Sequence, residues 1–266
     1  MLRPLLLLVL VASLFSCGNS DDTPSPTATG GSSAENELRN LVKKYPDSVA
    51  LRSRLVDYFA ENGNYENALT EANIMLQNDS NNAQLWDVKA RLLFLDGDTL
   101  SAIQAYERAI GIYPNPEYVI SLGTLYAQTK NPLAITMADA LLQAPLANAE
   151  LQAQFIKGLF YTYTGEKARA ISYFDRCISL DYNFMDAYRE KAIALYDEGK
   201  YETAIEVLDQ ATTVKKTYDE AWYWKGQCYQ RINKNKEAAE SYQVALQLDP
   251  DFIEAKDALS KMGIGQ

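Results

Sequence analysis

The sequence predicts an all-α fold in which pairs of helices repeat along the chain and stack into a solenoid with capping helices. The first observation is a period of 34 residues, seen in three successive sets of aromatic and small residues. The second is a glycine that recurs midway through the repeats, and the third is a proline at several repeat junctions. The three sets are Trp222, Gly226, Tyr229, Ala238, Tyr242, Ala245 and Pro250; Tyr188, Ala192, Leu195, Ala204, Leu208, Ala211 and Lys216; and Gln154, Gly158, Tyr161, Ala170, Phe174, Cys177 and Tyr182.

A small residue at the eighth and twentieth positions of each unit resembles the tetratricopeptide repeat, a helix-turn-helix of two amphipathic helices. The resemblance implies a right-handed superhelical solenoid of about six repeats that binds a partner on its concave face. Residues 116–150 fit least well, because Asn131-Pro132 shortens the turn between the two helices. The expected repeats are residues 49–82, 83–115, 116–150, 151–184, 185–218 and 219–252.

Each repeat leaves apolar surface that a neighbour must cover, so the stack is expected to form one continuous core with caps at its ends. Residues 34–48 are predicted to form the N-terminal capping helix, and residues 253–266 the C-terminal one. The recurring glycines fall where the first helix of a pair ends, a place that favours a left-handed backbone. They are Gly63, Gly97, Gly165 and Gly199.

The start of the chain predicts where the protein works. Residues 1–16 carry Arg3 followed by an apolar run, which is typical of a secretory signal and too short to span a bilayer. Leu14-Phe15-Ser16-Cys17 resembles the lipobox of bacterial lipoproteins, which implies cleavage before Cys17 and acylation of its thiol. Acyl chains would then attach the protein to the outer membrane without a transmembrane helix. The alternative is an ordinary cleavage site beside an unrelated cysteine.

Residues 17–33 are rich in Thr, Pro, Ser and Gly, which predicts a flexible tether between the lipid and the folded repeats. Within this stretch, Ser20-Asp21-Asp22 resembles the surface-export signal of Bacteroidetes lipoproteins and favours the cell-surface face over the periplasmic one. An acidic linker with no export role explains the same residues equally well.

Charge and cysteine content limit the classes of partner. The chain has 25 Lys and Arg against 35 Asp and Glu, a net charge of -10, which argues against nucleic acid and against membrane contact beyond the N-terminal lipid. Cys177 and Cys228 fall on core-facing positions and are expected to be buried free thiols. With no histidine, zinc-type cysteine pair or phosphate loop, we expect no metal, no cofactor and no catalysis.

The resemblance places the concave face at positions 2, 5, 9, 12 and 13 of each first helix. In this register Phe155, Arg189 and Tyr223 form one row, an aromatic trough with an arginine in its middle. Such a trough would suit a peptide with an apolar anchor and an acidic group. The predicted partner-binding residues are Phe155, Leu159, Tyr163, Arg189, Ile193, Tyr196, Tyr223, Gln227, Arg231, Arg91 and Phe94.

Two patterns bear on anionic ligands. The seventh position repeatedly holds a lysine, and we expect its stem to pack along the helix while the ammonium reaches water or a carboxylate of the neighbouring repeat. The lysine and asparagine pair with which chaperone-binding repeats hold a terminal carboxylate is absent, which disfavours a clamp of that kind. The lysines in question are Lys89, Lys157, Lys191 and Lys225.

Two short motifs predict modification. Asp47-Ser48-Val49 and Asp98-Thr99-Leu100 resemble the O-glycosylation motif of Bacteroidetes envelope proteins, and both lie in predicted turns. They make Ser48 and Thr99 candidate glycosylation sites.

Taken together, these features favour a lipid-anchored envelope protein that binds a peptide or protein in its groove and acts as a scaffold or adaptor for a multiprotein complex. One alternative is an accessory lipoprotein of an outer-membrane assembly, secretion or pilus machine. A second, disfavoured alternative is an enzyme that uses surface carboxylates. Homodimerisation through the terminal helices stays open.

Overall fold

The computed structural model describes residues 33–143 and 146–264, and this part of the chain forms fourteen α-helices and no strand. The predicted signal peptide (1–16), Cys17 and the tether as far as residue 32 lie outside the described residues. The helices are α1 (Ser33–Lys44), α2 (Val49–Glu61), α3 (Tyr65–Asn78), α4 (Ala83–Leu95), α5 (Thr99–Ile112), α6 (Pro116–Gln128), α7 (Leu133–Leu141), α8 (Ala149–Thr164), α9 (Lys167–Leu180), α10 (Met185–Asp197), α11 (Tyr201–Val214), α12 (Asp219–Arg231), α13 (Asn235–Leu248) and α14 (Ile253–Lys261).

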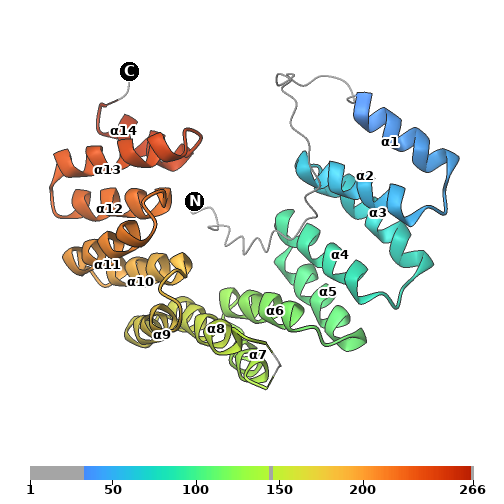
Figure 1. The fold of residues 1–266 in the computed structure, drawn as a ribbon, viewed down its shortest axis with the longest axis horizontal. Helices are drawn as coiled ribbons and strands as arrows, with labels where there is room; N and C mark the ends of the chain where they lie inside the picture. The colour runs from blue at the N-terminus through green and yellow to red at the C-terminus, as the bar shows by residue number, and fades with distance from the viewer. Residues whose placement is uncertain (1–32, 144–145, 265–266) are drawn as a thin grey trace.

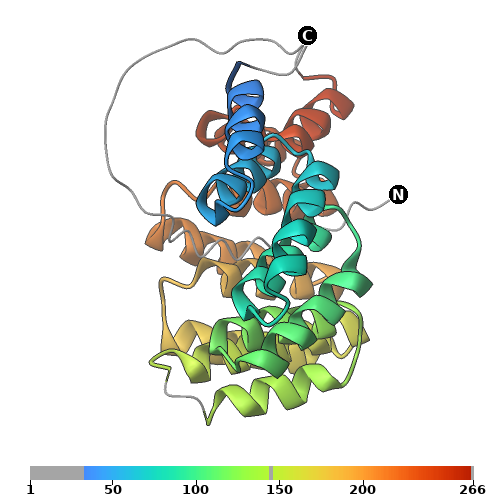
Figure 2. The ribbon, with the colours of Figure 1, turned by 90° about the vertical axis from the view of Figure 1, so that its right-hand side faces the viewer.

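Consecutive helices pack as antiparallel pairs, and the pairs stack into a curved solenoid that confirms the predicted fold class. In Figure 1 the stack bends into a U, with α6, α8 and α10 on the side of the hollow and α7, α9 and α11 on the outer side. Figure 2, turned by 90°, shows the first helices in front of the last ones and the bend of the U below them. The shape places the first helices of the middle repeats where a partner could enter.

Turn residues explain why each pair folds back on itself. The left-handed backbone predicted after the first helix is present, for example at Gly63 (φ +69°) and Gly165 (φ +89°). Lys130 and Asn233 take the same conformation in repeats that lack the glycine, with φ of 59° and 60°. The turn geometry is therefore kept in the third and sixth repeats even though the residue changes.

Close approach of the two helices in a pair depends on the small residue at the eighth position. A Cβ added at Gly158 would lie 2.5 Å from the Phe174 ring, and one added at Gly226 would lie 2.4 Å from the Tyr242 ring. Phe174 and Tyr242 are both fully buried. Each ring therefore occupies the space in which a side chain of the facing helix would otherwise stand.

The third repeat is the irregular one, as the sequence predicts. Helix α7 has only nine residues. The residue before it, Pro132, forms no side-chain hydrogen bond that would cap the start of the helix. Helix α8 has sixteen residues and begins at Ala149, two residues before the expected repeat boundary at 151. Because α7 is short, α6 packs directly against α8, and a Cβ at Gly123 would lie 2.9 Å from Ile156.

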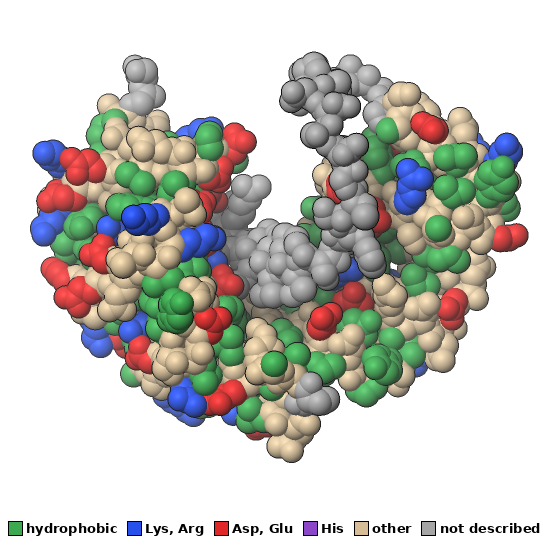
Figure 3. Space-filling view, viewed as in Figure 1, with side chains coloured by type: hydrophobic (Ala, Val, Ile, Leu, Met, Phe, Trp, Pro, Cys, Tyr) green, Lys and Arg blue, Asp and Glu red, His purple; other side chains and the backbone are tan. Residues whose placement is uncertain are grey.

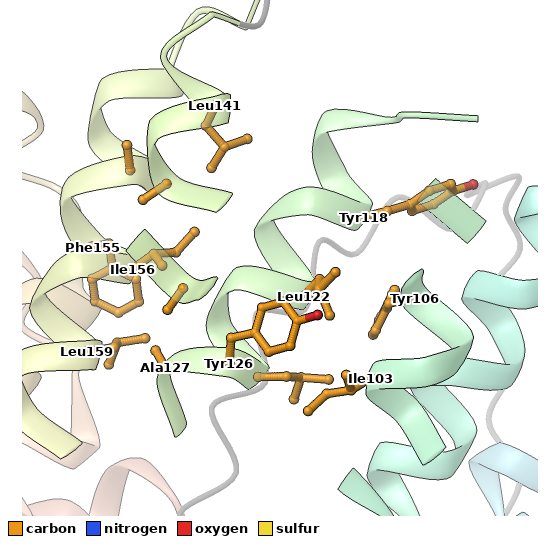
Figure 4. Close-up of a cluster of buried hydrophobic side chains, with 14 of the residues drawn as sticks. Ile103, Tyr106, Tyr118, Leu122, Tyr126, Ala127, Leu141, Phe155, Ile156 and Leu159 are labelled. Atoms are coloured by element: carbon orange, nitrogen blue, oxygen red, sulfur yellow. The ribbon is translucent and has the colours of Figure 1, made fainter. Parts of the chain in front are cut away.

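Buried apolar residues form four clusters in the described part of the chain, not the one continuous core that we expected. The largest runs from α4 to the start of α10, and Figure 4 shows its centre around Leu122, Tyr126 and Ile156. The next cluster begins at Tyr188, one residue after Ala187 closes the largest one. The break coincides with two buried charged residues, Arg189 and Glu190.

The Gly226→Ala substitution is expected to lower the free energy of unfolding by about 1–3 kcal/mol, because the new methyl group overlaps the Tyr242 ring. Gly111→Ala in α5 is the matched control, since a Cβ added there would have nothing within 4 Å of it. Urea unfolding of both variants measures the difference.

Adding Tyr242→Leu to Gly226→Ala recreates the buried pair Ala192 and Leu208 of the preceding repeat. The double variant should recover part of the lost stability, although it loses the 2.7 Å hydrogen bond from the Tyr242 hydroxyl to Gln230. Equal stability of Gly226→Ala and Gly111→Ala would contradict this packing account.

Candidate functional site: the concave face

The fifth position of the first helix packs at the repeat junction instead of lining the groove. Phe155 is 1% exposed, and its ring lies 5.8 Å from that of Phe174 and 4.9 Å from that of Phe184. Phe184 precedes α10, where one repeat passes into the next. The prediction that Phe155 contacts a partner is therefore wrong for this structure, because aromatic packing at the junction covers the ring.

Leu159 is also a core residue. It is fully buried (0% exposed) in the cluster shared by α6, α8 and α9, and Figure 4 shows it on α8 below Phe155 and Ile156. The direct contact between α6 and α8 covers the ninth position in this repeat. The prediction that Leu159 lines the groove is corrected for the same reason.

Arg189 lies below the surface of the groove and is surrounded by carboxylates. Its Nη1 is 2.9 Å from Asp186 Oδ1 and 2.7 Å from Glu220 Oε2, and its Nε donates to Glu190 Oε1 at 3.2 Å. The Tyr218 hydroxyl donates to the same Glu220 oxygen at 3.0 Å. Arg189 is 7% exposed, so it cannot serve as the free cation for an acidic peptide that the sequence predicted.

Three carboxylates against one guanidinium determine how this cluster ionises. Burial alone would lower the pKa of Arg189, but the charges of Glu190, Glu220 and Asp186 outweigh that effect and raise the pKa. Burial raises the pKa of Glu190, and Arg189 offsets that rise only in part. Tyr163, which is half-buried on α8, also has a raised pKa, through burial and then the Glu190 charge.

Tyr196 and Arg231 meet across the last two repeats. Arg231 Nε donates to the Tyr196 hydroxyl at 2.6 Å, and the Tyr196 ring packs edge-on against Trp224 with centroids 5.7 Å apart. Arg231 is exposed, whereas Tyr196 and Ile193 are half-buried. Their partial exposure leaves the prediction of partner contact open for these three residues.

Tyr223 and Gln227 line a depression of about 240 Å³ between α12 and α14. The Tyr223 ring packs against Phe252, Tyr242 and Trp224, with centroids 5.1–5.7 Å apart, and Tyr223 still borders the depression. Burial raises the pKa of Tyr223, and the nearby charge of Glu254 adds to the rise. The full lining is Tyr223, Gln227, Gln230, Glu254, Asp257, Ala258 and Lys261.

Sequence reasoning missed the contribution of α14 to this depression. We treated residues 253–266 as a solvating cap, yet Glu254 and Asp257 stand 34 residues after Glu220 and Tyr223 and so continue positions 2 and 5 of the repeat. Extending the repeat register by one helix would have identified both residues.

The second repeat places its predicted residues in two environments. Arg91 is exposed and forms an ion pair with Asp87, with Nε and Oδ2 3.3 Å apart. Phe94 is half-buried and packs on the largest core cluster. Between this repeat and the fourth, Thr124 is buried at the ninth position of α6.

The lysines at the seventh position pair with the preceding repeat, as predicted. Three of their Nζ atoms lie 2.6–2.7 Å from aspartate oxygens on the second helix of that repeat. The fourth, Lys89, places its Nζ 5.2 Å from the centroid of the Trp86 ring. The bridges are Lys157 to Asp139, Lys191 to Asp175 and Lys225 to Asp209. Lys157, Lys191 and Lys225 are therefore structural links between repeats, whereas Lys89 packs within its own helix.

The remaining predicted sites are placed as follows. Ser48 caps α2, its Oγ accepting from the Leu51 amide at 3.4 Å, and Thr99 is the first residue of α5.

Cys177 and Cys228 are free and buried, and burial raises the pKa of each thiol to about 12. Within residues 33–143 and 146–264 no group of three histidine, cysteine, aspartate or glutamate side chains is placed so that it could hold a metal ion. The same residues include no helix long and apolar enough to cross a bilayer.

Comparison with known proteins decides the family. Models of the tetratricopeptide repeat match residues 31–83, 54–115 and 189–251, together more than half of the chain, and a further one matches residues 151–184. The chain belongs to the tetratricopeptide repeat family. The matched ranges stop at residue 115 and resume at 151, which coincides with the irregular third repeat.

Solved structures share this fold. A tetratricopeptide repeat protein from Parabacteroides merdae superimposes with a TM-score of 0.72 at 20% identity, over 85% of this chain and 90% of that one. The type IV pilus biogenesis factor PilW superimposes with a TM-score of 0.61 at 18% identity, over 79% of this chain and 97% of PilW. Identities this low establish the fold alone.

One curated relative is an enzyme. The human Protein O-mannosyl-transferase TMTC1 is 27% identical over 167 residues, which cover 60% of this chain. The match spans only 18% of the length of that relative. Tetratricopeptide repeats form extended concave surfaces that bind peptides and proteins, so the family indicates a role in protein interaction.

The Arg189→Met variant is expected to lose about 3–5 kcal/mol of stability at neutral pH, because Glu190 is left buried without its cation. The raised pKa means that folded Glu190 holds its proton more tightly than the unfolded chain does. Ionised Glu190 therefore costs stability at high pH, and that cost disappears as the pH falls through the raised pKa.

In urea unfolding, the free energy of unfolding of Arg189→Met should therefore fall below that of the wild type by less at mildly acidic pH than at pH 7. Adding Glu190→Gln should restore part of the free energy that Arg189→Met loses at pH 7. If the loss of unfolding free energy is the same at both pH values and Glu190→Gln does not change it, the charge of Arg189 does not stabilise ionised Glu190.

Proposed function

We propose that this protein is a lipid-anchored scaffold of the bacterial cell envelope that holds a peptide or protein partner on its concave face. The observation that carries the proposal is the depression on the last repeat, where Tyr223, Gln227 and Gln230 meet α14. Aromatic side chains are enriched at protein–protein interfaces, and Tyr223 places one beside this depression. In the middle repeats Phe155, Leu159 and Arg189 are buried and support the inner face from within.

The anchoring part of the proposal is supported by sequence alone. The lipobox-like Leu14-Phe15-Ser16-Cys17 assigns Cys17 as the acylated residue, and residues 17–32 would act as the tether. Because α1 begins at Ser33, the tether is one residue shorter than we expected. Ser20-Asp21-Asp22 favours display on the cell surface, with the outer membrane as the site of attachment.

A second candidate role is that of an accessory subunit in a pilus, secretion or outer-membrane assembly machine. The fold shared with PilW along nearly its whole length favours this role. Both roles use the same groove and differ in the face of the membrane that carries the repeats. Neither role requires catalysis, and the absence of histidine from the chain supports a non-enzymatic function.

Photocrosslinking tests the groove. We expect benzoylphenylalanine at Gln227 to give a discrete adduct in living cells, because this residue lines the depression between α12 and α14. Benzoylphenylalanine at Glu206, an exposed residue of α11, is the matched control and should give none. Equal adducts from both positions, or adducts from Glu206 alone, would contradict binding on the concave face.

Fractionation of cells tests the anchor. Cys17→Ser is expected to move the protein from the membrane to the soluble fraction, because the acyl chains are then lost. Adding a protease to intact cells reports the face: digestion of the wild-type repeats indicates surface display, and protection until the outer membrane is broken indicates the periplasm. Membrane retention of Cys17→Ser would overturn the proposed lipid attachment.

A further inference from the structure

We propose that the inner face of the last two repeats and α14 binds a cationic segment of a protein partner, in which arginine or lysine side chains stand beside apolar ones. This inference rests on the proposed function and specifies the chemistry of its partner. It also replaces the acidic group that the sequence led us to expect in the ligand.

The first observation is a row of carboxylates along the stack. The second position of the first helix holds Asp186 in α10 and Glu220 in α12, and the same register gives Glu254 in α14. Asp186 and Glu220 are each about one-third exposed, with side-chain values of 31% and 33%. The row therefore continues across three stacked helices and reaches solvent.

The second observation is the charge balance below this row. Arg189 contacts Asp186, Glu190 and Glu220, so one positive charge faces three carboxylates. Since Arg189 is buried, it supplies no positive surface to an anionic partner. The surplus charge on the exposed edges of Asp186 and Glu220 favours a cation from outside.

The third observation is the form of the depression beside Glu254. Tyr223 offers an aromatic ring, Gln227 and Gln230 offer amide groups, and Glu254 and Asp257 offer carboxylates on the opposite helix. Neither carboxylate forms an ion pair within the described part of the chain. A guanidinium is planar, stacks on aromatic faces and donates in pairs to carboxylates, so an arginine side chain matches this set of groups.

Lys261 lines the same depression and opposes a cationic ligand. It stands in the last turn of α14, whereas Glu254 lies in the first turn of the same helix. Two carboxylates against one ammonium still leave the depression negative. Lys261 therefore provides a variant whose effect should be opposite in sign to that of the carboxylates.

At the other end of the stack, the predicted groove residue Arg91 is not a free cation. Asp57 lies near Glu61, and Arg91 is already paired with Asp87. Figure 3 shows acidic side chains together with basic ones along the inner edges of both arms of the U. On the inner face of α10, α12 and α14 the four carboxylates of Asp186, Glu220, Glu254 and Asp257 outnumber the exposed cations Arg231 and Lys261. Charge complementarity on this part of the concave face therefore favours a basic segment over an acidic one.

Fluorescence anisotropy with the full-length chain tests the inference. The probe is a short fluorescein-labelled peptide that alternates arginine with leucine, and its counterpart carries glutamate in place of arginine. At low salt we expect the arginine peptide to bind at least tenfold more tightly than the glutamate peptide. Added salt should weaken the binding of the arginine peptide. Equal affinity for the two peptides, or preference for the glutamate peptide, would overturn the inference.

Variants locate the binding. Replacing both carboxylates, as Glu254→Gln with Asp257→Asn, should weaken the affinity for the arginine peptide by roughly three- to tenfold. Lys261→Gln should tighten binding, and Glu206→Gln, which makes the same charge change as one groove substitution on the outer helix α11, should leave it unchanged. An effect of Glu206→Gln equal to that of the groove variants would show that only net charge matters and would overturn the assigned site.

The two proposals fail separately. A discrete crosslink from Gln227 together with no preference for the arginine peptide would leave groove binding intact and refute the basic partner. Absence of any groove-specific crosslink, with tight and site-dependent binding of the arginine peptide, would uphold the chemistry of the site and refute the proposed scaffold role.

Discussion

The close packing of a small residue under a bulky ring is the constraint on which the rest of this structure depends. A single helix pair cannot bury its own apolar faces, so its helices must approach closely and then stack on a neighbour. Gly158 under Phe174 and Gly226 under Tyr242 provide the first of these contacts. The lysine-to-aspartate bridges at the seventh position and the aromatic contacts at the repeat junctions then fix one pair on the next.

The same constraint divides the inner positions into structural and accessible ones. At the fifth position Phe155 and Arg189 are buried by contacts at the repeat junctions, whereas Tyr223 is half-buried and lines the depression at the last junction. Recognition therefore concentrates near the C-terminal end of the stack. There the side chains of α14 complete the depression beside Tyr223 and Gln227.

Sequence reasoning predicted the helices, the turn glycines and the structural role of the lysines, because each follows from a repeated local pattern. It failed at Leu159 because the short α7 brings α6 against α8, a tertiary effect that no local pattern contains. It failed at Arg189 because the partners of that residue come from two helices, and Glu190 lies at a position that we did not assign to the groove. It missed Glu254 because we ended the repeat register one helix too early.

The central claim is that the inner face of α10, α12 and α14 recognises a cationic segment while Phe155, Leu159 and Arg189 support that face from within. Chemical-shift mapping of the isotope-labelled full-length chain during titration with the arginine–leucine peptide tests it most directly. The account predicts the largest changes around Tyr223, Gln227 and Asp257, with little change on the outer helices. Changes centred on the outer helices α9 and α11 would contradict it.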